Sequence, residues 1–266
     1  MTIGQAVAIG GELRFISTVV DTQTVDVNAP FSVQPTAGTT VGPTVTYSLK
    51  SSVPSISIFD YWTPVTAVQR LLAGVAVNEM RISINGDFHE FEFRGPAQDI
   101  IDTESFVPDQ AGLTEFPLEP TVGTFGYSIV PGHMGQVWLG STPSRFYTLT
   151  AADIKLDNGI ETRSREFGLD GLRCITPGER NVTADFELYA DDKDETKALY
   201  ESARQRSPIR AMFQLGQQPT QLFGVYMKSV MPEVPQYDDS ETRLSWKFSG
   251  CRAQGTSDDE IVVAFG

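Results

Sequence analysis

The sequence has 266 residues, of which 40% are hydrophobic and 20% charged, and it carries a formal net charge of −14 at pH 7. This composition is typical of a globular protein and excludes an intrinsically disordered one. The 34 acidic residues against 20 basic ones argue against binding of nucleic acid, because most of the surface repels phosphate groups. A repelling surface still suits a passage through which nucleic acid slides without sticking.

Nothing in the sequence indicates a membrane or an oxidising compartment. The opening residues lack a basic segment and no apolar run approaches the ~20 residues of a spanning helix, so we expect no export signal and no membrane partner. The two cysteines, Cys174 and Cys251, are too few for a disulfide framework and indicate a reducing cytoplasm. Both are expected to be buried thiols.

The first feature in chain order is a long loop at residues 21–43, after a strand that contains Arg14 and Phe15. Structureless stretches of this length in compact domains are usually binding elements or disordered segments. Two interpretations stay open, a flexible insertion and a segment that becomes ordered against another subunit. The second is favoured by apolar residues that a solvated loop does not need: Val25, Val27, Phe31 and Val33.

Residues 63–75 have the pattern of an α-helix. Thr63 followed by Pro64 is typical of an N-cap and a first turn. Gly74 favours the end of this helix. Four apolar residues fall on one face at helical spacing, namely Val68, Leu71, Leu72 and Val75.

Two β-hairpins are predicted from Asn-Gly pairs, which favour tight two-residue turns. The first covers residues 81–93 and turns at Asn85-Gly86, and the second covers residues 154–163 and turns at Asn158-Gly159. Further strands are predicted at residues 45–49, 182–188, 212–215, 222–227, 243–248 and 261–265.

The second half of the chain repeats a long irregular stretch and a helix. The stretch covers residues 157–177. The helix is expected from Asp194, as its N-cap, to Arg206, because acidic residues gather at its start and Arg204 and Arg206 lie at its end.

Several features recur at an offset of 131 residues. The matching pairs are Arg14/Arg145, Phe15/Phe146, Thr63/Asp194, Val68/Leu199, Leu72/Ala203, Ile82/Phe213 and Ile84/Leu215. The offset predicts an internal duplication with domains at residues 1–131 and 132–266. Each half then has strands, a long loop and one flanking helix, which gives an α+β, mostly β fold of two tandem domains in which sheets pack together. A further echo, of FEFRGPAQD in WKFSGCRAQ, needs an offset of 155 and does not support this duplication.

No catalytic or metal-binding constellation is found in the sequence. His89 and His133 are expected on a hairpin face and in a Pro-Gly turn, where packing or surface roles are typical. The acidic run at residues 191–195 lacks the alternating oxygen ligands of a calcium loop and is better explained by helix capping. We therefore expect no enzyme, no metal site and no cofactor.

About residues 174–266 resemble the C-terminal region of major tail tube proteins of long-tailed, non-contractile (siphovirus-like) bacteriophages. The resemblance rests on RCITPGERNVTADFELYADDKDETKALYESA, PIRAMFQLG, QLFGVYM and DDSETRLSWKFSGCRAQGTSDDEIVVAFG, and more weakly on NGDFHEFEFRGPAQDIIDTESF at residues 85–106. It implies tail-tube-like β-sandwich domains, each with one flanking helix, in a structural virion protein that is assembled in the host cytoplasm. Stacked rings of it form a hollow tail through which DNA is ejected.

The resemblance also implies partners. These are further copies of the chain, a tape-measure protein and tail-end ring proteins, while DNA passes the lumen without specific binding. In this family the long loop commonly contacts the neighbouring ring. The residues expected at inter-ring or inter-subunit contacts are Val25, Val27, Phe31, Val33, Ile160, Phe167, Leu169 and Leu172.

The number of chains in a ring depends on the duplication. Many proteins of this family have one domain and form hexamers, so two domains predict a trimeric ring with pseudo-sixfold symmetry. Two other functions stay open, a distal tail or baseplate ring protein of the same fold and a carbohydrate-binding tail module. The second needs exposed aromatic platforms, yet Trp62, Trp138 and Trp246 lie among apolar neighbours or within a strand.

Overall fold

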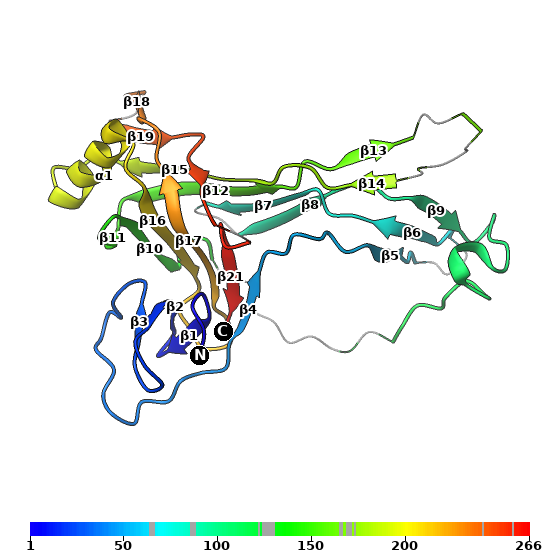
Figure 1. Ribbon diagram of the computed structural model, residues 1–266, viewed down its shortest axis with the longest axis horizontal. Coiled ribbons are helices and arrows are strands. Elements are labelled where there is room, and N and C mark those ends of the chain that lie inside the picture. The colour runs from blue at the N-terminus through cyan, green and yellow to red at the C-terminus, as the bar shows by residue number, and fades with distance from the viewer. Residues whose placement is uncertain are drawn as a thin grey trace.

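The computed structural model describes residues 1–63, 67–85, 89–121, 123, 131–164, 167–168, 172, 174–240, 242–256 and 258–266. Strands dominate these residues, and their one α-helix, α1 (Asp194–Gln205), lies at one end of a compact body (Figure 1). The mostly β fold class is thereby confirmed. An arm of smaller sheets projects away from the body on the side opposite α1 (Figure 1).

The body consists of two antiparallel layers that are joined at β20 (Arg252–Ala253), which pairs with one strand of each. The strand order is β11-β10-β16-β17-β21-β4 in the first layer and β18-β19-β15-β12-β7-β8 in the second. The first layer comprises β4 (Val45–Ser48), β10 (Gly135–Gly140), β11 (Ser144–Phe146), β16 (Ile209–Leu215), β17 (Phe223–Met231) and β21 (Val262–Phe265). The second comprises β7 (Glu79–Ile84), β8 (Glu90–Arg94), β12 (Leu149–Asp157), β15 (Asn181–Tyr189), β18 (Gln236–Asp238) and β19 (Ser245–Phe248).

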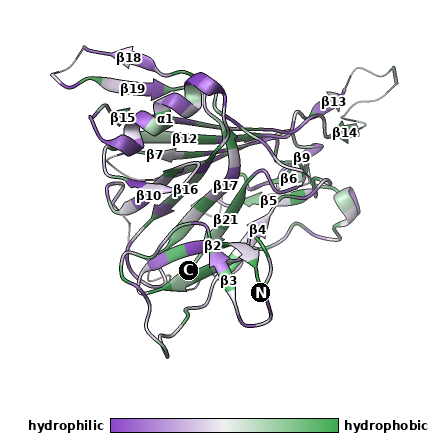
Figure 2. Ribbon diagram, turned by 60° about the vertical axis from the view of Figure 1, so that its left-hand side comes forward, coloured by the Kyte–Doolittle hydropathy of each residue, from purple (hydrophilic) through white to green (hydrophobic). Residues whose placement is uncertain are grey.

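The main hydrophobic core lies between these layers, because each turns a face of alternating apolar residues inward. The second layer contributes Ile82, Ile84, Ile154, Leu156, Phe186 and Leu188, and the first contributes Val137, Leu139, Phe213, Val225 and Met227. Leu199 and Ala203 of α1 belong to the same core. In Figure 2, β21 is hydrophobic along its whole length, and its residues Val262 and Ala264 are buried while Phe265 at its end is exposed.

The outer face of the first layer is covered by a small N-terminal sheet. This sheet consists of β1 (Ala6–Ile9), β2 (Glu12–Val19) and β3 (Val25–Val27). Phe15 of β2 stacks on Tyr226 of β17 with 5.4 Å between ring centroids. Gly224 permits the approach, since a Cβ there would lie 2.6 Å from a methyl carbon of Leu13.

The arm extends the second layer beyond the body. It contains a three-stranded sheet of β5 (Ile56–Asp60), β6 (Arg70–Val75) and β9 (Asp99–Asp102), the two-stranded ribbon of β13 (Glu161–Arg163) and β14 (Cys174–Thr176), and a short 3₁₀ turn, η1 (Gln110–Gly112). In chain order β6 leads into β7, β8 into β9, β12 into β13 and β14 into β15. These are four of the chain crossings between arm and body, since the chain also passes from β4 into β5 and from η1 back to β10.

The helix predicted at residues 63–75 is wrong over the part that the structure describes, where residues 70–75 form β6. This strand pairs with β5 on one side and β9 on the other. The apolar pairs Val68/Leu72 and Leu71/Val75 are four residues apart, a spacing that fits the period of a strand as well as a helical turn. Pairing with two distant segments decides between the two, and Pro64 lies outside the described residues.

One predicted hairpin is confirmed and the other is wrong. β7 pairs with β8, as expected for residues 81–93, although Gly86 lies outside the described residues. Asn158-Gly159 does not reverse the chain, because β12 runs through it into β13. The Asn158 side chain instead donates to the Val77 carbonyl at 3.0 Å, between body and arm.

The second predicted helix is confirmed, but its predicted cap is not. Lys193 occupies the N-cap position without a side-chain cap, and Asp194 is the first helical residue. The Asp191 carboxylate accepts hydrogen bonds from the Thr196 hydroxyl and the Lys193 N–H instead. Burial raises the pKa of Asp191, and these hydrogen bonds outweigh it, so that the pKa lies below its usual value. The helix start is thus stabilised by an aspartate two residues before the N-cap position and not by Asp194.

The helix correction removes part of the support for an internal duplication. The duplication requires Thr63 and Asp194 to begin equivalent helices, and among the described residues only 194–205 are α-helical. β7 and β8, from the first half, also lie in one layer with β12 and β15 from the second. The division at residues 131 and 132 stays a prediction.

Candidate assembly surfaces

The first part of the first predicted loop, residues 25–32, contacts the body. Val25 and Val27 lie in β3, which pairs with β2 of the same chain. Phe31 is half-buried, and its ring packs 5.2 Å from the guanidinium of Arg14. Val33, with 80% of its surface exposed, is the one of these four that projects into solvent. The stretch is therefore ordered against the body over residues 25–32, whereas residues 33–41 are exposed and form no strand.

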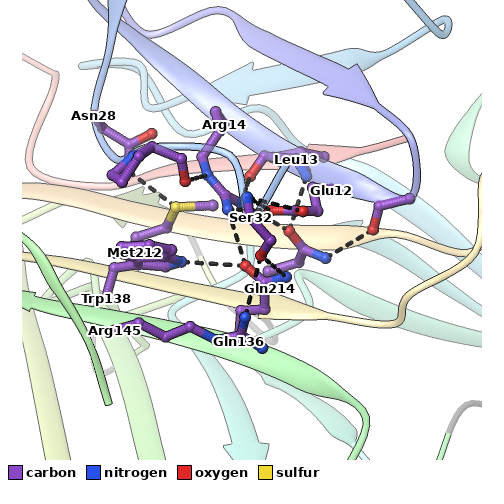
Figure 3. A network of polar contacts seen from close by, with 12 residues as sticks. Glu12, Leu13, Arg14, Asn28, Ser32, Gln136, Trp138, Arg145, Met212 and Gln214 are labelled. Atoms are coloured by element: carbon purple, nitrogen blue, oxygen red, sulfur yellow. Dashed lines mark hydrogen bonds and ion pairs between the residues drawn. The ribbon is translucent and has the colours of Figure 1, made fainter. Parts of the chain in front are cut away.

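A buried arginine holds this segment in place (Figure 3). Arg14 is fully buried and forms an ion pair with Glu12. Its guanidinium also donates to the Pro30 carbonyl at 3.0 Å, to Gln136 Oε1 at 2.9 Å and to Gln214 Oε1 at 3.1 Å. The N-terminal sheet, the first layer and the 28–32 segment thus meet at one side chain.

The side chains around Arg14 keep it charged and are themselves hydrogen-bonded. Burial lowers the pKa of Arg14 to about 10, while the adjacent Glu12 carboxylate raises it, so the guanidinium is charged at neutral pH. Gln214 accepts from the Leu13 N–H at 2.8 Å and donates to two backbone carbonyls. Because buried polar groups are costly when unpaired, this network specifies how the N-terminal sheet docks.

The second predicted loop forms the β13–β14 ribbon of the arm. Ile160 and Leu172 are half-buried, and both line a small cavity against the β5-β6-β9 sheet. Phe167 is fully exposed near the tip of the ribbon. Leu169 lies outside the described residues. Of the second group of expected contact residues, Phe167 is therefore the one that the structure offers to a partner.

Four of the chain crossings between body and arm, those next to β7, β8, β12 and β15, are hydrogen-bonded to one another, and the Gly178 N–H links the last of them by donating to the Asn158 carbonyl at 3.1 Å. Asn78 is the central residue, since its carbonyl accepts from the Asn158 N–H at 2.8 Å and its side-chain oxygen accepts from the Ile160 N–H at 2.7 Å. The Asn78 N–H in turn donates to the Arg94 carbonyl at 2.8 Å. Gly95 allows this packing, because a Cβ there would lie 1.9 Å from the Ala76 carbonyl oxygen. We call these crossings the neck.

One side of the body, which we call the open side, leaves aromatic residues uncovered. Phe91 packs on Phe223 at 4.9 Å, Phe223 on Phe265 at 5.0 Å, and Phe265 on Tyr47 at 6.2 Å between centroids. Phe91, Phe265 and Tyr47 are 44%, 48% and 55% exposed, and Phe93 beside them is 60% exposed. β4, which carries Tyr47, and β8, which carries Phe91 and Phe93, are the edges of the two layers and each pair with one strand among those described.

The opposite side of the body is covered by α1. Leu199 and Ala203 enter the core there, and Tyr200 packs on Trp246 of β19 with 5.2 Å between ring centroids. The edge strands near this side are β11 and β18 (Figure 1). The two sides therefore differ in kind, one being covered by a helix and the other exposing apolar rings.

The outer face of the second layer, which we call the open face, is polar. It carries alternating residues of β7, β8, β12, β15, β19 and β20, whose other face forms the core. Arg81 and Asp153 form a bidentate pair across two strands, with Arg81 Nε 2.9 and 2.7 Å from the two carboxylate oxygens. The hydrogen bonds from Arg81 to Asp153 raise the pKa of Arg81.

Neither a metal site nor a common platform of tryptophans is found in the part of the chain that the structure describes. No cluster of three or more metal-ligating side chains occurs there. A hollow of 710 Å³ lies between β2, β4 and β17 and is lined by hydroxyl groups, a few apolar residues and the Lys228–Asp259 ion pair. Trp62 is exposed, Trp138 is buried and Trp246 lies in the α1 side of the core, so the three do not form a common platform.

The two cysteines and His89 have contrasting surroundings. Cys251 is buried, and burial raises its pKa to about 11. Cys174 is exposed on β14, so the expectation that both thiols are buried is wrong for this residue. No sequence pattern indicates the arm, which exposes β14 by carrying it away from the core. Burial lowers the pKa of His89, whose ring nitrogens are both enclosed.

Sequence reasoning finds the residues of the open side but not their role. The predicted hairpin at residues 81–93 contains Phe91 and Phe93, and the predicted strand at residues 45–49 contains Tyr47. Only the order of strands in each layer shows that β4 and β8 are edges. The alternation within a strand reports which face is apolar, and it carries no information on whether a neighbour lies beside that strand.

Comparison with known protein families identifies a match over most of the chain. Residues 6–259 match the family that is described as phage tail tube protein. The match covers nearly the whole chain and extends well beyond the segments that carry the resemblance in the sequence. No curated protein matches significantly. Among the described residues no helix is long and apolar enough to cross a membrane.

Proposed function

The chain belongs to the phage tail tube protein family, and from this premise we propose that it assembles into rings that stack into the hollow tail of a long-tailed phage. As a member of this structural family it is a component of the virion tail. The proposed tube conducts DNA from the capsid into the host. Assembly is proposed to take place in the host cytoplasm, around a tape-measure protein and between terminal ring proteins.

The open side carries this proposal. A row of aromatic rings between two sheet edges is costly in water, and sheet edges without a neighbour invite pairing with another chain. A second copy of the chain is the natural partner, because addition of a strand satisfies the edge backbone groups and buries the rings together. Burying apolar surface contributes roughly 25 cal/mol per Å².

The geometry favours contacts from one side of a subunit to the other side of the next. β4 and β8 are edges on the open side, and β11 and β18 are edges near α1. Unlike edges that meet head to tail generate a closed ring when the rotation between subunits closes. We therefore assign the contacts within a ring to these four strands.

Contacts between rings are assigned to the exposed parts of the two predicted loops. Val33 and Phe167 expose nearly all of their side chains. The arm, with Phe167 on its β13–β14 ribbon, reaches beyond the body and is suited to contact a neighbouring subunit (Figure 1). Val25, Val27, Phe31, Ile160, Leu169 and Leu172 stay predicted contact residues, and those of them that are described would act mainly by supporting Val33 and Phe167.

The stoichiometry of the ring follows from the number of equivalent units in a chain. The offset of 131 residues predicts three chains with pseudo-sixfold symmetry. The two layers with α1 form one such unit per chain, which supports six. The mass of an isolated ring distinguishes three chains of 29.2 kDa from six.

Electron microscopy of the purified chain tests the proposal. We expect long tubes from the wild-type chain and dispersed subunits from the double variant Phe91→Ser, Phe93→Ser. Val20→Ser is the matched control, because Val20 is 59% exposed directly after the end of β2 and lies outside both the open side and the arm. Circular dichroism verifies that each variant is folded.

The same images separate the alternatives. Isolated rings without stacks would identify a distal tail or baseplate ring protein. Tubes from the Phe91/Phe93 variant that match those of the wild type would refute the role of the open side. A wild-type chain that stays monomeric at all concentrations would refute the proposed function itself.

A further inference from the structure

The open face of the second layer carries more acidic than basic side chains, and each of its basic side chains forms an ion pair with a carboxylate. Its strands place eight carboxylates there, those of Glu79, Glu90, Glu92, Asp153, Asp157, Asp185, Glu187 and Asp238. They place five basic groups on the same face, those of Arg81, Arg94, Lys155, Lys247 and Arg252. The face is therefore acidic, although bases make up more than a third of its charges.

Each of the five bases lies in an ion pair. The pairs are Arg81–Asp153, Arg94–Glu92 at 2.6 Å, Lys155–Glu79 at 3.4 Å, Lys247–Asp238 at 2.5 Å and Arg252–Glu179 at 3.1 Å. Lys247 also lies 3.8 Å from Glu187. All these side chains are partly exposed, and such pairs stabilise a fold by only about 0–1 kcal/mol each. Stability alone therefore does not account for pairing of all five.

Ion pairing of the bases weakens the attraction of the open face for phosphate groups. A free lysine or arginine attracts phosphates and releases counterions, which is the main source of non-specific binding to DNA. A base that a carboxylate already neutralises offers no such contact. The carboxylates left over, such as Glu90 and Asp185, repel the phosphates at a distance of about one Debye length, ~8 Å at physiological salt.

We infer that the open face lines the lumen of the tube and that its carboxylates hold the five bases away from the DNA, so that double-stranded DNA passes without sticking. This inference rests on the proposed function and adds to it the surface that meets the DNA. The other broad face of the body is covered by β1, β2 and β3. The open face is the one whose long strands form an uninterrupted wall.

Releasing two bases should convert the wall into a surface that binds DNA. The variant Glu79→Gln, Asp153→Asn removes the carboxylates that pair with Lys155 and Arg81 and preserves the shape of both replaced side chains. Tubes of this variant should retain a short DNA duplex at low ionic strength at least tenfold more than wild-type tubes. The excess should fall as salt is added, with a logarithmic slope of about −0.9 for each phosphate that a released base neutralises.

The control changes the total charge equally without freeing these bases. Asp192→Asn with Glu201→Gln removes the same two charges at exposed positions near α1. We expect tubes of this control to retain no more DNA than the wild type. Equal retention by both variants would show that net charge alone matters and would overturn the role of the pairs.

Labelling tests the position of the face independently of DNA. Two variants are made in a Cys174→Ser background. Thr183→Cys places a thiol on the open face of β15, and Glu201→Cys, the control, places one on α1. A bulky maleimide should label position 183 in subunits but at least tenfold more slowly in tubes, where it enters only through the ends. Equal labelling of position 183 in tubes and subunits would overturn the inference. Absence of tubes from the wild type would instead contradict the proposed function.

Discussion

At the scale of single residues, a few buried polar side chains decide how segments dock. Arg14 is the clearest case, since one guanidinium joins the N-terminal sheet, Gln136 and Gln214 of the first layer, and the Pro30 carbonyl. A buried charge is expensive unless it is paired and hydrogen-bonded, and here every direction of the fork has a partner. The arrangement fixes the orientation of the sheet, which apolar packing by itself leaves less specific.

Replacement of Arg14 should destabilise the subunit strongly. Arg14→Leu leaves Glu12 without its partner and strips hydrogen bonds from two buried glutamines, so we expect the free energy of unfolding to fall by about 3 kcal/mol. Urea denaturation of the unassembled subunit measures it. Arg70→Leu, which removes an exposed ion pair with Asp60, should cost about 0–1 kcal/mol. Similar costs for both variants would contradict a structural role of the network.

At the scale of elements, the neck determines where the arm points. β6 and β7 form one continuous path, as do β12 and β13, and the hydrogen bonds around Asn78 connect these paths. The neck is made of backbone groups in close contact, which explains the glycine at position 95. Such a link transmits the orientation of the body to the arm, because no long side chain intervenes.

A methyl group at position 95 should therefore loosen the arm without unfolding the body. In Gly95→Ala the added carbon meets the Ala76 carbonyl oxygen, and relief of the overlap should cost about 1–3 kcal/mol. Hydrogen exchange should speed up for amides of β6 and β9 and stay unchanged in β16. Gly123→Ala is the control, because a Cβ there meets nothing within 4 Å. Unchanged exchange in β6 would show that the neck tolerates the shift.

At the scale of the whole molecule, the subunit exposes three surfaces that the proposed assembly would bring into contact with a neighbour. The open side exposes aromatic rings between two sheet edges, the arm exposes Phe167 beyond the body, and the open face presents paired charges. Each surface calls for a different neighbour, namely another subunit of the ring, another ring and hydrated DNA. The reactivity of the two native thiols, Cys174 and Cys251, tests the contact with another ring.

Cys174 should become protected when tubes form. It is exposed on β14 of the arm, so a maleimide should label it readily in isolated subunits. If the β13–β14 ribbon contacts a neighbouring ring, labelling in tubes should slow at least tenfold. Cys251 serves as an internal control, because burial and a pKa of about 11 keep it unreactive until the chain unfolds. Equal labelling of Cys174 in tubes and subunits would place the ribbon outside the contact.

The sequence by itself determined the β-rich class, most strands of the two layers and the helix at residues 194–205. These depend on local patterns, namely alternation along a strand and capping charges at a helix. It also determined the acidic surface, which follows from composition. The family resemblance in the second half is carried by these same segments, such as the alternating run from Val182 to Leu188.

The tertiary structure decided what depends on distant neighbours. Residues 70–75 became a strand because β5 and β9 pair with them, although their spacing also fits a helix. Asn158-Gly159 became part of the neck because Asn78 lies beside it, and Phe91 and Tyr47 became a surface because β8 and β4 are edges. A sequence records which face of a strand is apolar. Which segments lie on either side of that strand is set by long-range pairing, and that pairing defines the candidate assembly surfaces.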